Sequence, residues 1–190
     1  MANLITLDEY KIASKINGLG DDSRISNLIT AVSALVKTYC NNTIVDYYTA
    51  NKTETFSIDF ASSSVQLTES PVNSIVTVKE RTGISSAYVT LVADKDYYLD
   101  TVTDSIFRSN SGNLYKNFPR GPGAVEVVYK AGWETCPEDL KLAVIDLVKY
   151  YFKDEHKQRQ NLGSASIQNA ASTVAYPDHI KRVLDLYKNY

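Results

Sequence analysis

Apolar residues recur at every third or fourth position in several segments of the chain, which is the spacing of a single helical face. The clearest of these segments predicts a helix over residues 22–40, opened by the caps in Asp21-Asp22-Ser23. Its apolar positions are Ile25, Leu28, Ile29, Val32, Leu35, Val36 and Tyr39. Before it, the capping-box pattern Thr6-Leu7-Asp8-Glu9 opens a shorter helix over residues 6–16, which Asn17-Gly18-Leu19-Gly20 is expected to end.

A third helix is predicted over residues 137–157, with Pro137 in the first turn, where proline is tolerated. It carries two apolar stripes on different sides. One is Leu140, Ala143, Val144, Leu147, Val148 and Tyr151, and the other is Leu142, Ile145 and Phe152. Two apolar sides indicate burial nearly all round, within the core or between the core and a neighbouring subunit. We therefore expect Leu142, Ile145 and Phe152 in a core helix or a subunit interface.

Between these helices, at about residues 43–131, the apolar period changes to two, which is typical of strands. Phe56-Ser57-Ile58-Asp59-Phe60 is one such run, and breakers such as Pro71, Gly83 and Gly112 divide the region. The region is therefore expected to form a small, mostly antiparallel β module. The predicted fold class is α+β, with an N-terminal helix pair, this central module and a long core helix.

The C-terminal part divides into two segments. Residues 159–175 are rich in Ser, Ala and Asn without a sustained apolar pattern, which favours a flexible linker. Residues 176–190 then predict an amphipathic helix that a linker would leave free to reach a partner. The alternative is that this helix packs back on its own domain. The predicted organisation is thus a body over 1–158, the linker, and a C-terminal docking helix.

Composition narrows the function classes. The chain has 190 residues and a formal net charge of −2, which argues against a protein held on DNA by phosphate neutralisation. No apolar run has membrane-spanning length, and the first residues lack a signal-peptide layout, so we expect a cytoplasmic product without a membrane partner. The 14 tyrosines are consistent with recognition surfaces as well as strands.

No pattern in the sequence predicts catalysis, a cofactor or a metal site. The two cysteines, Cys40 and Cys136, lie far apart and outside any ligand motif. His156 and His179 also lack neighbouring ligand residues, and the acidic pair before residue 23 fits a helix cap. We predict that the protein is not an enzyme, although a site assembled only in the fold stays open.

The order of these elements, with particular residues, resembles the head-tail connector adaptor (head completion) family of tailed bacteriophages. The most specific stretch is a strand ending in Tyr129-Lys130-Ala131-Gly132-Trp133, followed by Pro137-Glu138-Asp139-Leu140 at the start of the long helix. Pro71-Val72-Asn73-Ser74-Ile75, Asp96-Tyr97-Tyr98-Leu99-Asp100 and Phe118-Pro119 precede it in the family's order. The resemblance covers roughly residues 4–158.

The resemblance implies a virion protein of the neck or connector, made in the host cytoplasm. It would form a homo-oligomeric ring, expected to be dodecameric, which docks on the portal protein, meets the next neck or tail protein, and lets DNA pass through its lumen. In that family the C-terminal segment commonly engages the portal. The portal-docking residues implied here are Tyr176, Ile180, Lys181, Val183, Leu184, Tyr187 and Tyr190. The alternatives are another neck or tail-completion protein and an α+β interaction domain unrelated to phages.

Overall fold

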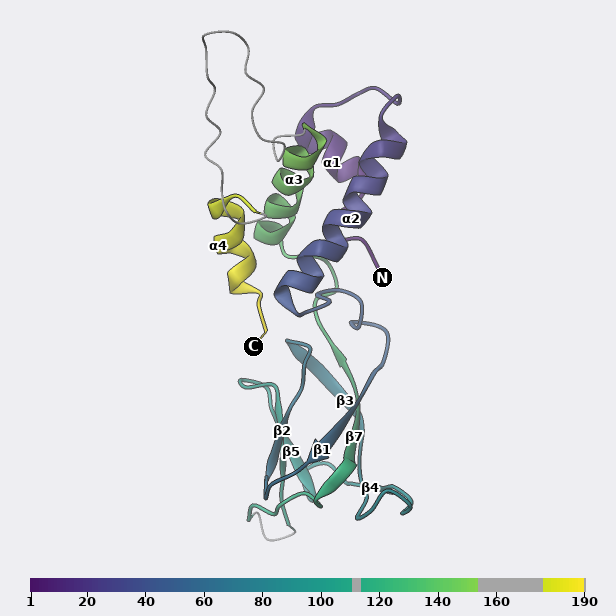
Figure 1. The fold of residues 1–190 in the computed structure, drawn as a ribbon, viewed down its shortest axis with the longest axis vertical. Coiled ribbons are helices and arrows are strands. Elements are labelled where there is room, and N and C mark those ends of the chain that lie inside the picture. The colour runs from purple at the N-terminus through teal and green to yellow at the C-terminus, as the bar shows by residue number, and fades with distance from the viewer. Residues whose placement is uncertain (111–113, 154–175, 190) are drawn as a thin grey trace. The chain divides into compact units, whose positions relative to one another are not determined.

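The computed structural model describes residues 1–110, 114–153 and 176–189. The chain forms two compact units: a helical unit from residues 1–42 and 135–190, and a β unit from residues 43–134. The described residues contain four helices and two antiparallel sheets, which confirms the α+β class (Figure 1). The β unit is thus inserted between two parts of the helical unit. The predicted linker at 159–175 lies outside the described residues, as does Tyr190.

The N-terminal helix pair consists of α1 (Leu7–Ser14) and α2 (Asp22–Cys40). The capping box forms: the Thr6 hydroxyl accepts a hydrogen bond from the Glu9 amide at 3.2 Å, and the Glu9 carboxylate accepts one from the Thr6 amide at 2.7 Å. Helix α1 ends before the predicted residue 16 because Lys15 adopts a left-handed conformation with φ 55°. Its amide then bonds back to the carbonyl of Ile12, so a non-glycine residue forms the C-cap.

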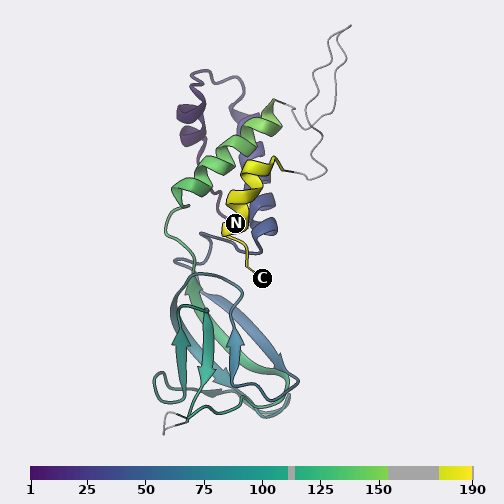
Figure 2. The same cartoon turned by 90° about the vertical axis from the view of Figure 1, so that its left-hand side faces the viewer.

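The core of the helical unit is formed by α2, α3 (Glu138–Phe152) and α4 (Asp178–Leu186), and α3 and α4 both pack against α2 and each other. The three helices lie side by side in both views of the ribbon (Figures 1 and 2). Helix α3 begins one residue later than predicted because Pro137 has extended backbone angles. The core side chains include Ile25, Ile29, Val36, Leu140, Val144, Leu147, Val148, Ile180 and Leu184, all buried.

The β unit contains two antiparallel sheets. Strands β1 (Lys52–Ile58), β7 (Gly121–Ala131), β3 (Val72–Glu80) and β4 (Val89–Thr90) form the first sheet in that order. Strands β2 (Ser64–Gln66), β6 (Ser105–Arg108) and β5 (Tyr97–Asp100) form the second. Their inward-facing side chains share one core, which includes Val65, Leu67, Val78, Ile106, Phe118, Val125, Val127 and Tyr129.

Charged groups also lie in the interior of the β unit. The Arg108 guanidinium, only 4% exposed, donates two hydrogen bonds of 2.9 Å to the Glu80 carboxylate. Buried Glu69 accepts hydrogen bonds from the Thr43 amide at 2.8 Å and the Lys52 ammonium at 2.9 Å. Each charge is paired, as burial requires, so these contacts fix the positions of strands that are far apart in sequence.

The backbone conformation at residue 132 explains why the sequence pattern has a glycine there. Its φ of +94° is rarely adopted by a residue with a side chain, and a Cβ at this position would collide with the Ile44 carbonyl. The close approach lets the Gly132 amide donate to the Pro71 carbonyl and the Trp133 amide to the Ile44 carbonyl, both at 2.8 Å. The glycine is therefore required where the long strand β7 leaves the sheet.

Candidate interaction surfaces

Potential metal ligands are not clustered in the described parts of the chain. No group of three His, Cys, Asp or Glu residues there could hold a metal ion. Burial raises the pKa of the Cys40 thiol to about 11 and that of Cys136 to about 12, so both stay protonated at neutral pH. His179 is exposed, and His156 lies outside the described residues. None of the helices that the structure describes could span a membrane.

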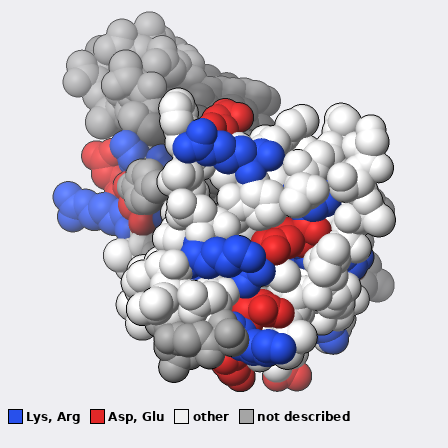
Figure 3. Space-filling view, turned by 90° about the horizontal axis from the view of Figure 1, so that it is seen from below, with Lys and Arg blue, Asp and Glu red and all other residues white. Residues whose placement is uncertain are grey.

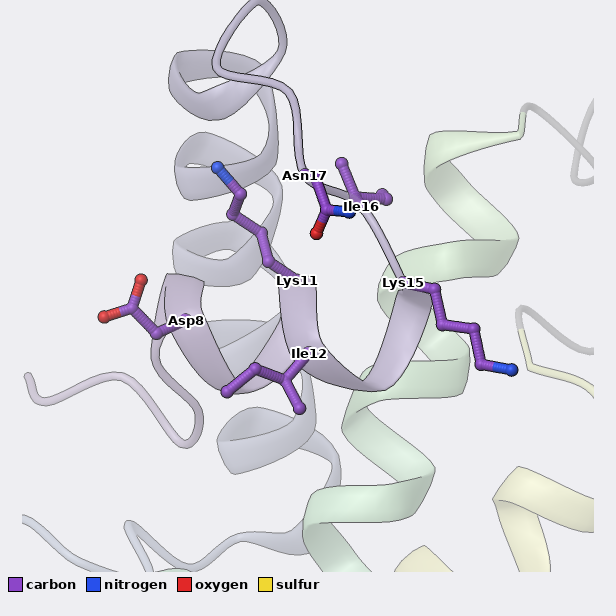
Figure 4. A pocket seen from close by; sticks show the side chains of 6 residues that line it. All are labelled: Asp8, Lys11, Ile12, Lys15, Ile16 and Asn17. Atoms are coloured by element: carbon purple, nitrogen blue, oxygen red, sulfur yellow. The ribbon is translucent and has the colours of Figure 1, made fainter.

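A shallow hollow follows α1 and the residues after it, lined by Asp8, Lys11, Ile12, Lys15, Ile16 and Asn17. The side chains of Lys11 and Lys15 point away from one another, so they do not converge on a ligand (Figure 4). The Lys11 ammonium instead pairs with the Asp22 carboxylate at 2.8 Å and ties α1 to α2. This hollow has the features of an ordinary helix surface, apart from Ile12, which is 79% exposed.

The predicted docking helix lies against its own unit. Tyr176, Ile180 and Leu184 are 7%, 1% and 0% exposed, so their side chains belong to the core of the helical unit. Lys181, Val183 and Tyr187 are partly exposed, and Tyr190 lies outside the described residues. This is the alternative arrangement that the sequence left open. Contact between these residues and a portal stays a prediction.

Polar contacts fasten α4 in place as well. The Tyr39 hydroxyl donates to the Asp185 carboxylate at 2.6 Å, and the Tyr187 hydroxyl donates to the Asp139 carboxylate at 2.6 Å. The bond to Asp185 raises the pKa of Tyr39 to about 12 because it stabilises the protonated phenol. Beyond the helix, the Asn189 amide donates to the carbonyl of Cys40, the last residue of α2, at 2.8 Å.

The three residues of the second stripe on α3 have different surroundings. Ile145 is 8% exposed and belongs to the core, whereas Leu142 is 61% exposed. Phe152 is half-buried, and the Arg24 guanidinium lies over its ring at 4.7 Å from the ring centre. Of the three, Leu142 is the one whose side chain is available to a neighbouring subunit.

An aromatic cluster on the β unit was not predicted from the sequence. Tyr98 of β5 stands opposite Phe107 of β6, with their ring centres 5.9 Å apart, and Tyr115 lies 5.8 Å from Phe107. Tyr98 is 49% exposed and Tyr115 is 74% exposed. The sequence signal was the strand pattern itself: Tyr97 and Ile106 point inward, so their neighbours Tyr98 and Phe107 must face outward. Apolar residues at outward positions indicate a contact surface.

Charges of both signs occur close together on one face of the molecule (Figure 3). On the face shown in Figure 3, positive and negative side chains are interspersed and separated by wide uncharged areas. The described residues of that face form no continuous basic stripe of the kind expected of a DNA-holding surface, in accord with the net charge of −2.

Comparison with known proteins shows which protein family the chain belongs to. Residues 3–190 match the head completion protein family, which is nearly the whole chain. The chain belongs to that family. Family membership confirms the resemblance seen in the sequence motifs and makes the chain a structural protein of the phage virion rather than an unrelated interaction domain. A head completion protein of Escherichia phage T5 is 23% identical over 187 residues, covering 97% of this chain and 98% of that protein.

Solved structures with the same fold come from gene transfer agent (GTA) particles. A chain in the neck of an empty GTA particle, computed with C6 symmetry, is similar with a TM-score of 0.61 at 14% identity, covering 98% of this chain and 90% of that chain. A chain in the neck of a native GTA particle, computed with C12 symmetry, has a TM-score of 0.58 at 16% identity and covers 100% and 96%. The fold of this member of the head completion family therefore recurs, over nearly its full length, in the two GTA neck chains.

Proposed function

We propose that this chain completes the phage head as a ring-forming adaptor between the portal vertex and the tail. The observation that carries the proposal is its family, matched over residues 3–190, together with a full-length fold shared with a chain of a C12 neck. Its place in the virion is then the neck, and its partners are the portal protein and the next neck or tail protein.

A ring of identical subunits fits the surfaces of the chain. Closed rings are built from head-to-tail contacts, in which two different patches of each subunit meet. Exposed apolar side chains occur at separate places, including Leu142 on α3 and Tyr115 in the β unit. The similar GTA chains come from necks computed with C6 and C12 symmetry, so a dodecamer is the ring size we propose.

The portal contact is assigned to α4, with the residues inferred from the sequence. Lys181, Val183 and Tyr187 are partly accessible where they are. Tyr176, Ile180 and Leu184 reach the portal only after α4 leaves the helical unit, because their side chains are buried there. Docking through all six therefore requires that portal contacts replace the contacts of α4 with α2 and α3, including the bond from Tyr39 to Asp185.

The lumen of such a ring has to let DNA pass. A surplus of Lys and Arg would bind the phosphate backbone of DNA, and each neutralised phosphate would increase the affinity. The chain instead has 20 Lys and Arg residues against 22 Asp and Glu residues. Its near-neutral charge suits passage without retention.

Native mass spectrometry of the purified protein, alone and mixed with portal rings from the same phage, tests the proposal. We expect portal complexes that carry a closed set of copies of this chain, whether or not the free protein is monomeric. The absence of any portal complex would contradict the adaptor function and would favour another neck or tail-completion role.

Hydrogen exchange in the same complexes tests the assignment of α4. Peptides within residues 176–189 should change their exchange rate on portal binding, whereas exposed peptides of α1 around Ile12 serve as a reference. Unchanged exchange in α4, with protection elsewhere, would transfer the portal contact to another surface.

A further inference from the structure

We propose that neighbouring copies in the ring contact each other through opposite sides of the β unit, a contact that rests on the proposed ring function. One side carries the aromatic patch, defined as Tyr98, Phe107, Leu114 and Tyr115 with Asp94. The other carries the hairpin patch, defined as Arg81, Ile84 and Val89. In each contact, the aromatic patch of one copy receives the hairpin patch of the next.

The aromatic patch is more than a set of scattered exposed residues. The rings of Tyr98 and Phe107 are stacked with an angle of 26° between their planes, and Tyr115 is tilted against Phe107 at 54°. Tyr98, Phe107, Tyr115, Asp94 and Ser109 line a hollow of about 240 Å³. Leu114, which directly precedes Tyr115 in the chain, is 66% exposed. A preformed hollow with rigid aromatic walls suits an inserted aliphatic side chain.

The hairpin patch presents such side chains. Arg81 and Ile84 lie in the connection between β3 and β4, and Val89 is the first residue of β4, where it pairs with Glu80 of β3. Ile84 is 69% exposed and Val89 is 62% exposed. Arg81 holds the connection by donating to the Gly123 carbonyl at 2.9 Å and the Ile84 carbonyl at 3.1 Å, with its guanidinium 4.7 Å from the Tyr88 ring centre. The apolar side chains are thus held on an ordered turn.

The two patches lie on opposite sides of the same unit. Figure 1 shows β5 on the left of the β unit and the β4 hairpin at its right edge. Two different patches on opposite sides cannot form a two-fold symmetric dimer with each other. Repeated between copies, they give the head-to-tail contact from which rings are closed.

The charged groups of the two patches support a second copy of this chain as the partner that binds the aromatic patch. The Asp94 carboxylate lines the aromatic hollow, and no Lys, Arg or His of the described ranges forms an ion pair with it. Arg81 likewise has carbonyl partners but no carboxylate partner within those ranges. A contact between the patches would bring these opposite charges together at its rim, where they favour the correct register. The same carboxylate disfavours nucleic acid, which could otherwise stack on the exposed rings.

Disulfide trapping tests the contact in portal-bound rings. In the V89C/Y115C variant, mild oxidation should link successive copies, and a non-reducing gel should show a ladder extending beyond dimers. The single variants V89C and Y115C should give no ladder, because each places a new thiol on one side only. T53C/V89C is the matched control, since Thr53 is an exposed residue of β1 outside both patches. The native thiols of Cys40 and Cys136 are buried.

The outcomes separate the two proposals. Portal-bound rings without a ladder, or an equal ladder in T53C/V89C, would overturn the contact while the adaptor function stands. Failure of the wild-type chain to bind portals would refute the adaptor function itself. As a second measurement, Y115D and V89D should each weaken ring assembly about tenfold or more at an unchanged unfolding midpoint. Assembly at the wild-type level in both variants would also overturn the contact.

Discussion

The helical unit and the β unit differ in how well the sequence pattern foretold which apolar side chains are covered. In the helical unit, α4 is the segment whose amphipathic pattern most suggested a partner, yet Ile180 and Leu184 are buried against α2 and α3. In the β unit, Tyr98 of β5 and Tyr115, which follows β6 in the chain, face solvent although no amphipathic helix pattern pointed to them. The difference shows that a pattern identifies an apolar face, whereas only packing identifies what covers it.

The interiors of the two units also differ. Aliphatic faces of α2, α3 and α4 fill the helical core, and the ammonium of buried Lys37 reaches the carbonyl of Ala2 at 2.7 Å. The β core instead encloses the ion pair between Arg108 and Glu80. Both cores lose stability when apolar volume is removed, and the β unit is in addition sensitive to the loss of one partner of this ion pair.

One of the two largest effects is expected from Arg108→Ala. Removing the guanidinium leaves the Glu80 carboxylate, whose side chain is only 14% exposed, without its partner, which should cost about 3 kcal/mol of unfolding free energy. Denaturation followed by the fluorescence of Trp133, the single tryptophan of the chain, reports on the β unit. Lys116→Ala, at an exposed position of the same unit, is the control and should be close to neutral. Equal stability of the two variants would mean that the buried pair does not hold the sheets.

Leu184→Ala probes the same comparison in the helical unit. Its side chain is 0% exposed, so truncation should cost about 3 kcal/mol, measured by circular dichroism at the helical signal. Leu186→Ala removes the same atoms from a side chain that is 77% exposed on the same helix and should change stability little. If both variants match the wild type, α4 does not belong to the core in solution.

The hydrogen bond from Tyr39 to Asp185 should give a smaller, pH-dependent contribution. Tyr39→Phe is expected to lose about 1 kcal/mol at neutral pH. Because the folded pKa of Tyr39 is raised to about 12 from 10.0, the neutral phenol stabilises the fold fully below pH 10. The difference between wild type and variant should then shrink as the pH rises from about 10 to about 12. A difference that stays constant across that window would disprove the role of the bond.

Tyr115→Ser should have the smallest effect on stability, below about 0.5 kcal/mol, because the ring is 74% exposed. Thermal unfolding of the isolated protein measures it. A large loss would show that the aromatic patch stabilises its own unit, in which case its exposure would no longer indicate a contact with another copy.

Local patterns predicted much of the helical unit. The three-and-four spacing placed α2 at residues 22–40, the range in which it is found. The spacing on α3 predicted its first apolar stripe, in which Leu140, Val144 and Leu147 are buried. Burial nearly all round was wrong, because Leu142 of the second stripe is 61% exposed. The end of α1 was missed because Lys15, rather than a glycine, takes the left-handed conformation.

The sheet arrangement and the candidate contact surface could not be predicted in the same way. The order β1-β7-β3-β4 depends on pairings between strands that are distant in sequence, which no local period encodes. The pairing of Tyr98 with Phe107 is visible only once β5 and β6 are in register. The sequence could name an apolar face on α4, but not that α2 and α3 cover it.

Deleting the gene for this chain from its phage tests the central claim most directly. Electron microscopy of the particles should show heads separated from tails, and adding the purified protein should restore complete, infectious virions. The appearance of complete, infectious virions without this chain would contradict the claim that it completes the head.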